Sequence, residues 1–75
     1  MPHIIVKLWT GKTEEQKKLL AEELAKTAMA VLNTKEASFS VSIEDVDRED
    51  WAEKVYMPDI VGQKEKLYKA PGYKM

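Results

Sequence analysis

The residue with the clearest chemical potential is Pro2, which directly follows the initial methionine. Methionine is normally removed when a small residue such as proline comes next, and the mature chain would then begin with a free secondary amine. That amine can accept a proton, whereas the amide nitrogen of an internal proline cannot. Burial and nearby cations such as Lys12 disfavour the charged amine and lower its pKa. Many chains begin Met-Pro without being enzymes, so Pro2 alone is a weak signal.

Three other features could carry chemistry, and each also has a simpler explanation. The triplet Gly11-Lys12-Thr13 has the ending of a phosphate-binding loop, but that motif needs a glycine five residues earlier, where Val6 stands. The single histidine, His3, is more often structural or exposed than catalytic in such a position. We expect the acidic run from Glu44 to Asp50 to form a solvated loop.

Chain length limits how the protein can be stabilised. A chain of 75 residues forms one domain, here residues 1–75, and buries too little surface to be comfortably stable as a monomer. It has no cysteine and one histidine, which excludes a disulfide framework or a zinc site as the source of stability. We therefore expect a homo-oligomer.

Charge and hydropathy restrict the partners. The net charge is -1, from 12 basic and 13 acidic side chains, so neither nucleic acid nor a membrane surface is expected as a partner. No apolar run approaches the roughly 18 residues that span a bilayer, and the first residues lack the features of a secretory signal. The expected location is the cytoplasm.

Hydrophobic periodicity predicts a strand, a long helix and a second strand. Alternating side chains with many β-branched residues indicate a strand over His3–Trp9, and a second over Ala37–Glu44. Thr13 and Gln16 have the spacing of a capping box, which predicts a helix from Thr13 to about Leu32. Its apolar stripe is Leu20, Leu24, Ala28 and Val31.

Strand, helix and strand in this order form a right-handed βαβ unit with a two-stranded parallel sheet, so the fold class is α/β (α+β). The helix covers one sheet face, and we expect the other face to pack on the same face of another subunit. Pro58 is expected to separate a short turn from a C-terminal helix over about 59–69. Pro71-Gly72 predicts a turn near the end.

Several short motifs follow one another along the chain: Pro2 at the head of a strand, the Gly11-Lys12 turn, the Glu14-Glu15-Gln16-Lys17 helix start, the Leu32-Asn33 helix end and the alternating second strand. Their order resembles the 4-oxalocrotonate tautomerase family over most of the chain up to Trp51. The ending Lys69-Ala70-Pro71-Gly72-Tyr73 is similar to that of the PptA-type small tautomerases.

This resemblance implies a keto–enol tautomerase that needs no cofactor or metal, with Pro2 as the base. Lys12 occupies the position of one family arginine and Ser40 that of the other, while Trp51 holds the aromatic position. Lys12 keeps the charge but not the bidentate fork of arginine, and Ser40 loses both. The expected substrate is therefore less charged than a dicarboxylate, for example phenylenolpyruvate. The tail favours a dimer over a hexamer.

Two alternatives remain open from the sequence. The same scaffold could be a non-catalytic module that binds a small ligand or a protein, because a fold does not fix a function. Family relatives with the same proline perform hydrolytic dehalogenation or decarboxylation, but the chain lacks an evident second cation or positioned base for these reactions. Trp51 could equally be an ordinary core or interface residue.

Overall fold

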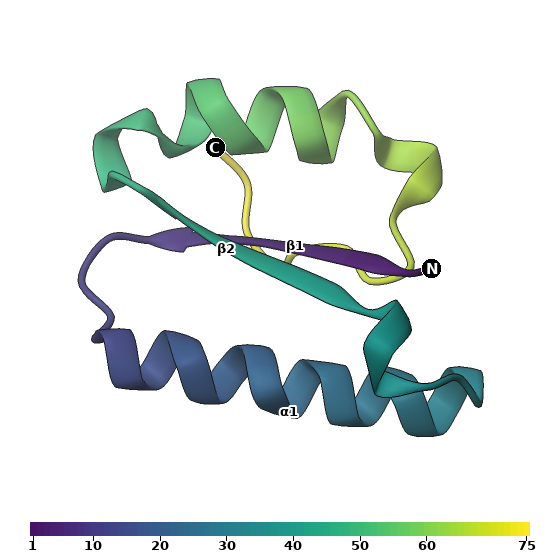
Figure 1. Ribbon diagram of the computed structural model, residues 1–75. Helices are drawn as coiled ribbons and strands as arrows, with labels where there is room; N and C mark the ends of the chain where they lie inside the picture. Colours follow the sequence, from purple (N-terminus) through teal and green to yellow (C-terminus); the bar gives the residue numbers. More distant parts are fainter.

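Two strands, β1 (His3–Trp9) and β2 (Ser40–Val46), pair in parallel at the centre of a computed structural model that describes residues 1–75 (Figure 1). The register pairs His3 with Ser40 at one end and Trp9 with Val46 at the other. The helix α1 (Glu14–Leu32) connects the strands. The predicted βαβ unit, its parallel sheet and the bounds of the first strand are confirmed.

The second strand begins and ends later than the alternation predicted. The residues before it form a 3-10 turn over Glu36–Ser38, in which the Ser38 hydroxyl donates to the Lys35 carbonyl at 2.8 Å. These local hydrogen bonds compete with strand pairing. At the other end, pairing with β1 continues to Val46, so the start of the acidic run lies in the strand and not in a loop.

The helix α1 begins and ends where the capping residues predicted. The Thr13 hydroxyl accepts from the Gln16 N–H at 3.0 Å, and the Gln16 side chain accepts from the Thr13 N–H at 2.9 Å. This reciprocal capping box satisfies two backbone donors that would otherwise lack partners. At the other end Asn33 adopts the left-handed conformation, and its N–H donates to the Met29 carbonyl.

The face of α1 that packs on the sheet differs from the predicted stripe. Leu24 and Ala28 are half-buried as expected, but Leu20 and Val31 are 36% and 76% exposed. Leu20 and Val31 lie on the flank of the helix, outside the packed face, which contains three alanines. The half-buried residues of α1 are Lys17, Ala21, Leu24, Ala25, Ala28 and Met29.

The C-terminal helix lies earlier than predicted. A π-helix, η3 (Ala52–Val61), contains Pro58 and ends early in the range predicted to be helical. The rest of that range holds only a 3-10 turn, η4 (Lys64–Lys66). At the end of η3 the Gly62 N–H donates to the Met57 carbonyl at 2.8 Å. A Cβ at position 62 would lie 2.8 Å from the Pro58 carbonyl oxygen, so this helix end requires glycine.

The helix η3 lies on the sheet face opposite α1 (Figure 1). Lys7 of β1 donates to Asp59 of η3 at 2.6 Å, and the two buried residues, Val46 and Val55, come from β2 and η3. The expectation that no part of the chain covers this face is therefore wrong. Coverage is partial, because Ile5, on the same face as Lys7, is 59% exposed.

Much of the surface remains open to solvent. The accessible area is 6197 Å², against about 4,700 Å² for a compact monomer of this mass. The radius of gyration is 13.8 Å, where a compact chain of this length has about 11 Å. Separately, none of the helices is both long enough and apolar enough to cross a membrane.

Replacing Thr13 with alanine tests the capping box. Thr13→Ala removes the hydroxyl that accepts from the Gln16 N–H, so the free energy of unfolding should fall by about 1 kcal/mol in urea denaturation. Thr27→Ala is the matched control, because Thr27 is exposed in the middle of α1 and alanine favours helix there. Equal stability of the two variants at one protein concentration would contradict the cap assignment.

Titration of Lys7 tests how η3 is attached. The hydrogen bond that Lys7 donates to Asp59 raises the pKa of Lys7 above its ordinary value of 10.5. Desolvation lowers this pKa, and the negative charge of Asp59 raises it further. Because the pKa of Lys7 is raised in the folded state, the pair stabilises the fold while Lys7 is protonated. This stabilisation is lost as the pH rises through the pKa that Lys7 has in the folded protein. Asp59→Asn should lower the pKa of Lys7, measured by NMR titration of its side-chain carbons.

Asp45→Asn provides the control, because Asp45 pairs with Lys17 at 3.0 Å and not with Lys7. It should lower the pKa of Lys17 and leave that of Lys7 unchanged. If Asp59→Asn left the Lys7 titration where it is in the original protein, the attachment of η3 through this pair would be refuted.

Candidate active site

Pro2 lies immediately before β1 and is half-buried. Its carbonyl oxygen accepts a hydrogen bond from the Ser40 N–H at 3.3 Å, so the start of the second strand fixes the position of Pro2. The pyrrolidine ring also locks one backbone torsion. Met1, in contrast, is fully exposed. The chain therefore holds Pro2 firmly at the sheet edge and leaves the residue before it accessible.

Ser40 lies at the same end of the sheet as Pro2. Its hydroxyl is hydrogen-bonded to Nδ1 of His3 at 2.7 Å, and the two residues are also paired across the strands. The structure thus brings Ser40 next to Pro2, as the candidate site requires. It also gives His3 a partner that sequence patterns did not indicate.

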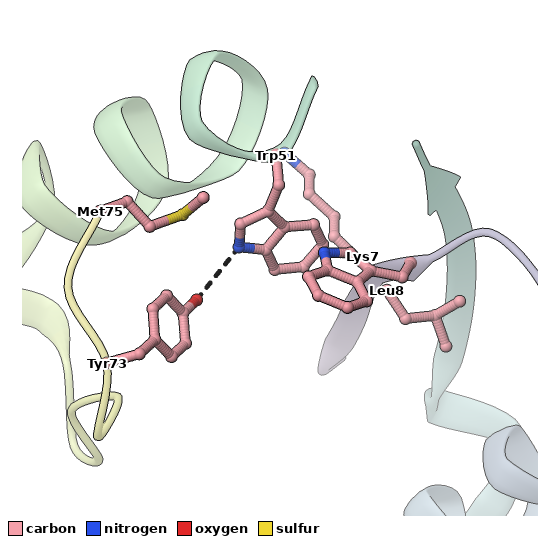
Figure 2. Close-up of a pocket in the computed structure, with 6 residues that line it drawn as sticks. Lys7, Leu8, Trp51, Tyr73 and Met75 are labelled. Atoms are coloured by element: carbon pink, nitrogen blue, oxygen red, sulfur yellow. Dashed lines mark hydrogen bonds between the residues drawn. The ribbon is translucent and has the colours of Figure 1, made fainter. Parts of the chain in front are cut away.

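The aromatic residues gather at the opposite end of β1 (Figure 2). There a cavity of about 650 Å³ opens between the end of β1, the start of η3 and the C-terminal residues. The Trp51 indole N–H points at Tyr73 and donates to its hydroxyl oxygen at 3.0 Å. The lining is apolar except for one cation, and consists of Lys7, Leu8, Trp9, Trp51, Tyr73 and Met75.

Lys12 lies in the turn between β1 and α1, at the same end as Trp9. Gly11 before it has a φ of 131°, a conformation that other residues rarely adopt, so the tight turn depends on glycine. The Lys12 side chain is exposed and makes no ion pair. No carboxylate of the chain lies within ion-pair distance of its ammonium group.

The four candidate residues therefore form two groups at opposite ends of the sheet. Pro2 and Ser40 lie at the start of the strands, and Lys12 and Trp51 lie beyond their end. A strand of seven residues spans roughly 20 Å, so one chain does not bring the two groups together. Within a single chain Lys12 cannot lower the pKa of Pro2 as expected.

Sequence reasoning missed several residues at the aromatic end. Arg48, the only arginine in the chain, holds its guanidinium 4.9 Å from the centre of the Trp9 ring, in a cation–π contact. Trp9, Tyr73 and Met75 line the cavity although they are far apart in sequence. No periodicity or spacing connects residues 9, 51 and 73, so no local signal indicated this cluster.

Potential metal ligands do not come together anywhere in residues 1–75. No group of three or more His, Cys, Asp or Glu side chains is arranged to hold a metal ion. The chain instead offers a proton acceptor, once Met1 is lost, at one end of its sheet, and an apolar cavity at the other. These parts suit proton transfer on a small organic molecule.

Known proteins resemble this chain over most or all of its length. Residues 2–58 match the family described as tautomerase enzyme. The chain is 48% identical over 73 residues to a probable tautomerase of Xylella fastidiosa, covering 97% of this chain and 89% of that protein. It is 36% and 37% identical to the tautomerases PptA of Enterobacter sp. and Cronobacter sakazakii, over the full length of both chains in each case. The chain belongs to the tautomerase family.

Proposed function

We propose that the protein is a cofactor-free keto–enol tautomerase whose general base is the terminal amine of Pro2, released by loss of Met1. One observation carries the proposal: Pro2 is held at the sheet edge by its hydrogen bond from Ser40, while Met1 before it is fully exposed. The relatives named tautomerases support tautomerase activity, and so an isomerase, in general terms.

The proposed reaction is a proton transfer that conserves all atoms. The neutral amine of Pro2 takes the proton from the enol hydroxyl, and the resulting enolate carries the negative charge. The prolinium then returns the proton to carbon, which yields the keto form and regenerates the base. Half-burial of Pro2 disfavours the charged amine and so favours the free base near neutral pH.

A complete site requires two chains in this proposal. A small enol cannot touch Pro2 and the aromatic cavity of one chain, because they lie roughly 20 Å apart along β1. A two-fold axis that sets the strands of two copies antiparallel would bring Pro2 of one copy to Lys12 and Trp51 of the partner subunit. The PptA-like tail favours a dimer as the smallest such assembly.

The exposed surface supports association. The chain exposes about 1,500 Å² more than a compact monomer of its mass, and a standard interface buries only about 800 Å² on each partner. Apolar side chains outside the aromatic cavity contribute to this excess, among them Ile5 on the partly covered sheet face and Leu20 and Val31 on the flank of α1.

The candidate substrate is an enol acid with few charges, such as phenylenolpyruvate. The cavity beside Trp51 is apolar, and its one cation, Lys7, is already paired with Asp59. The free ammonium of Lys12 can meet a single carboxylate or the developing enolate. A retained Met1 would instead favour a non-catalytic module that binds small ligands in the same cavity.

Replacement of Pro2 tests the base. Intact mass should show loss of Met1 in the original protein and in Pro2→Ala, because alanine is also small. Pro2→Ala should slow ketonisation of phenylenolpyruvate about 100-fold or more, because the positioned secondary amine is gone. Pro58→Ala, an exposed proline in η3, is the matched control and should keep its rate. Retention of Met1, or equal rates for Pro2→Ala and the original protein, would remove Pro2 from the mechanism.

Mixed oligomers test whether the site is shared. Pro2→Ala and Lys12→Ala should each have low activity alone, since each defect is repeated in every site of its own oligomer. When the two variants are unfolded together and refolded, a mixed dimer contains one site with Pro2 from one copy and Lys12 from the other. Random refolding makes about half of the dimers mixed, and one of the two sites in each mixed dimer is intact. Activity should therefore rise towards about a quarter of that of the original protein.

The control is the same mixture without unfolding, measured before subunits exchange. A refolded mixture no more active than the average of its parts would show that each site lies within one chain. Normal turnover by Lys12→Ala alone, at every pH, would show that Lys12 is only a turn residue.

A further inference from the structure

The C-terminal residues form one wall of the aromatic cavity. After η4 the chain passes without regular structure at the level of the strands and turns up to end beneath η3 (Figure 1). Leu67 and Pro71 are half-buried in this segment. The Tyr73 ring lies 5.8 Å from the ring of Tyr56 in η3, tilted by 37°. Tyr73 is thus held by a ring contact on η3 while its hydroxyl faces Trp51 (Figure 2).

The hydrogen bond from Trp51 to Tyr73 limits how the indole can turn. An indole has one polar group, its N–H donor, so this bond of 3.0 Å is the only hydrogen bond that the ring can donate. Rotation of the ring would break it. The bond therefore fixes the plane of the indole relative to the cavity.

The rest of the cavity favours a flat, uncharged group. Trp9 and Trp51 both line it, and its volume of about 650 Å³ lies in the range of small-molecule sites. The positive charge of Lys7 is neutralised by Asp59 at 2.6 Å, so no side chain of the lining carries a free charge. An aromatic group that stacks on an indole fits these walls better than an aliphatic or charged one.

We propose that Tyr73 is a positioning residue, which orients Trp51 so that the cavity selects the aromatic group of an aryl enol acid. This inference names the substrate class of the proposed tautomerase and rests on that function. Tyr73 acts through the indole and takes no part in proton transfer. Its loss therefore weakens the binding of aromatic substrates and leaves turnover of bound substrate nearly unchanged.

The variant Tyr73→Phe tests this role, because it keeps the ring beside Tyr56 and removes the acceptor for Trp51. Its KM for phenylenolpyruvate should rise roughly 3- to 10-fold, as expected for one lost hydrogen bond, with kcat within about two-fold. The KM for an enol with an aliphatic chain should not change. Tyr68→Phe is the matched control, since Tyr68 is fully exposed.

NMR provides a readout that does not depend on activity. The indole N–H signal of Trp51 should move upfield in Tyr73→Phe, while the signal of Trp9 stays in place as an internal reference. An unmoved Trp51 signal, or an equal rise in KM for aromatic and aliphatic enols, would overturn the inference.

A binding experiment separates this inference from the proposed function. The probe is 3-phenylpropanoate, an aromatic acid that cannot tautomerise, titrated into Pro2→Ala with and without Tyr73→Phe. Weaker binding in the double variant supports the role of Tyr73 even if the protein proves to have no tautomerase activity. Equal binding would refute that role even if Pro2 proves to be the base.

Discussion

The parallel pairing of β1 and β2 determines where all the candidate chemistry lies. Parallel strands place their starts together and their ends together, so the register of His3 with Ser40 fixes Pro2 beside Ser40. The same register places Trp9 beside Val46, from which the chain continues to Trp51. One pairing pattern thus separates Pro2 from the aromatic cavity by the length of a strand.

This arrangement leaves the single chain with little interior. Val46 and Val55 are the only buried side chains, because one helix covers each sheet face and neither layer is wide enough to enclose the other side chains. Pairs at the surface, such as Lys7 with Asp59, attach η3 to the sheet but add little hydrophobic stabilisation. The open surface of the chain and the separation of the candidate residues into two groups have the same origin, a sheet of only two strands.

The sequence predicted best those elements whose signals are local. The alternation over His3–Trp9 and the capping pair Thr13 and Gln16 each involve neighbouring residues, and the structure confirms both. The prediction failed at Pro58, where a general rule against proline in helices missed the wider hydrogen-bonding pattern of a π-helix. It also failed at the start of β2, where serine hydrogen bonds favoured a turn.

The sequence by itself determined the βαβ order, the parallel sheet and the candidate residues Pro2, Lys12, Ser40 and Trp51. Tertiary structure alone decided which of these are neighbours, and it added Arg48 and Tyr73 to the aromatic end. The reason is physical: strand and helix signals depend on contacts within a few residues, whereas the cavity depends on side chains that only the folded C-terminal segment brings to β1. No spacing along the chain indicates that the C-terminal segment returns to β1.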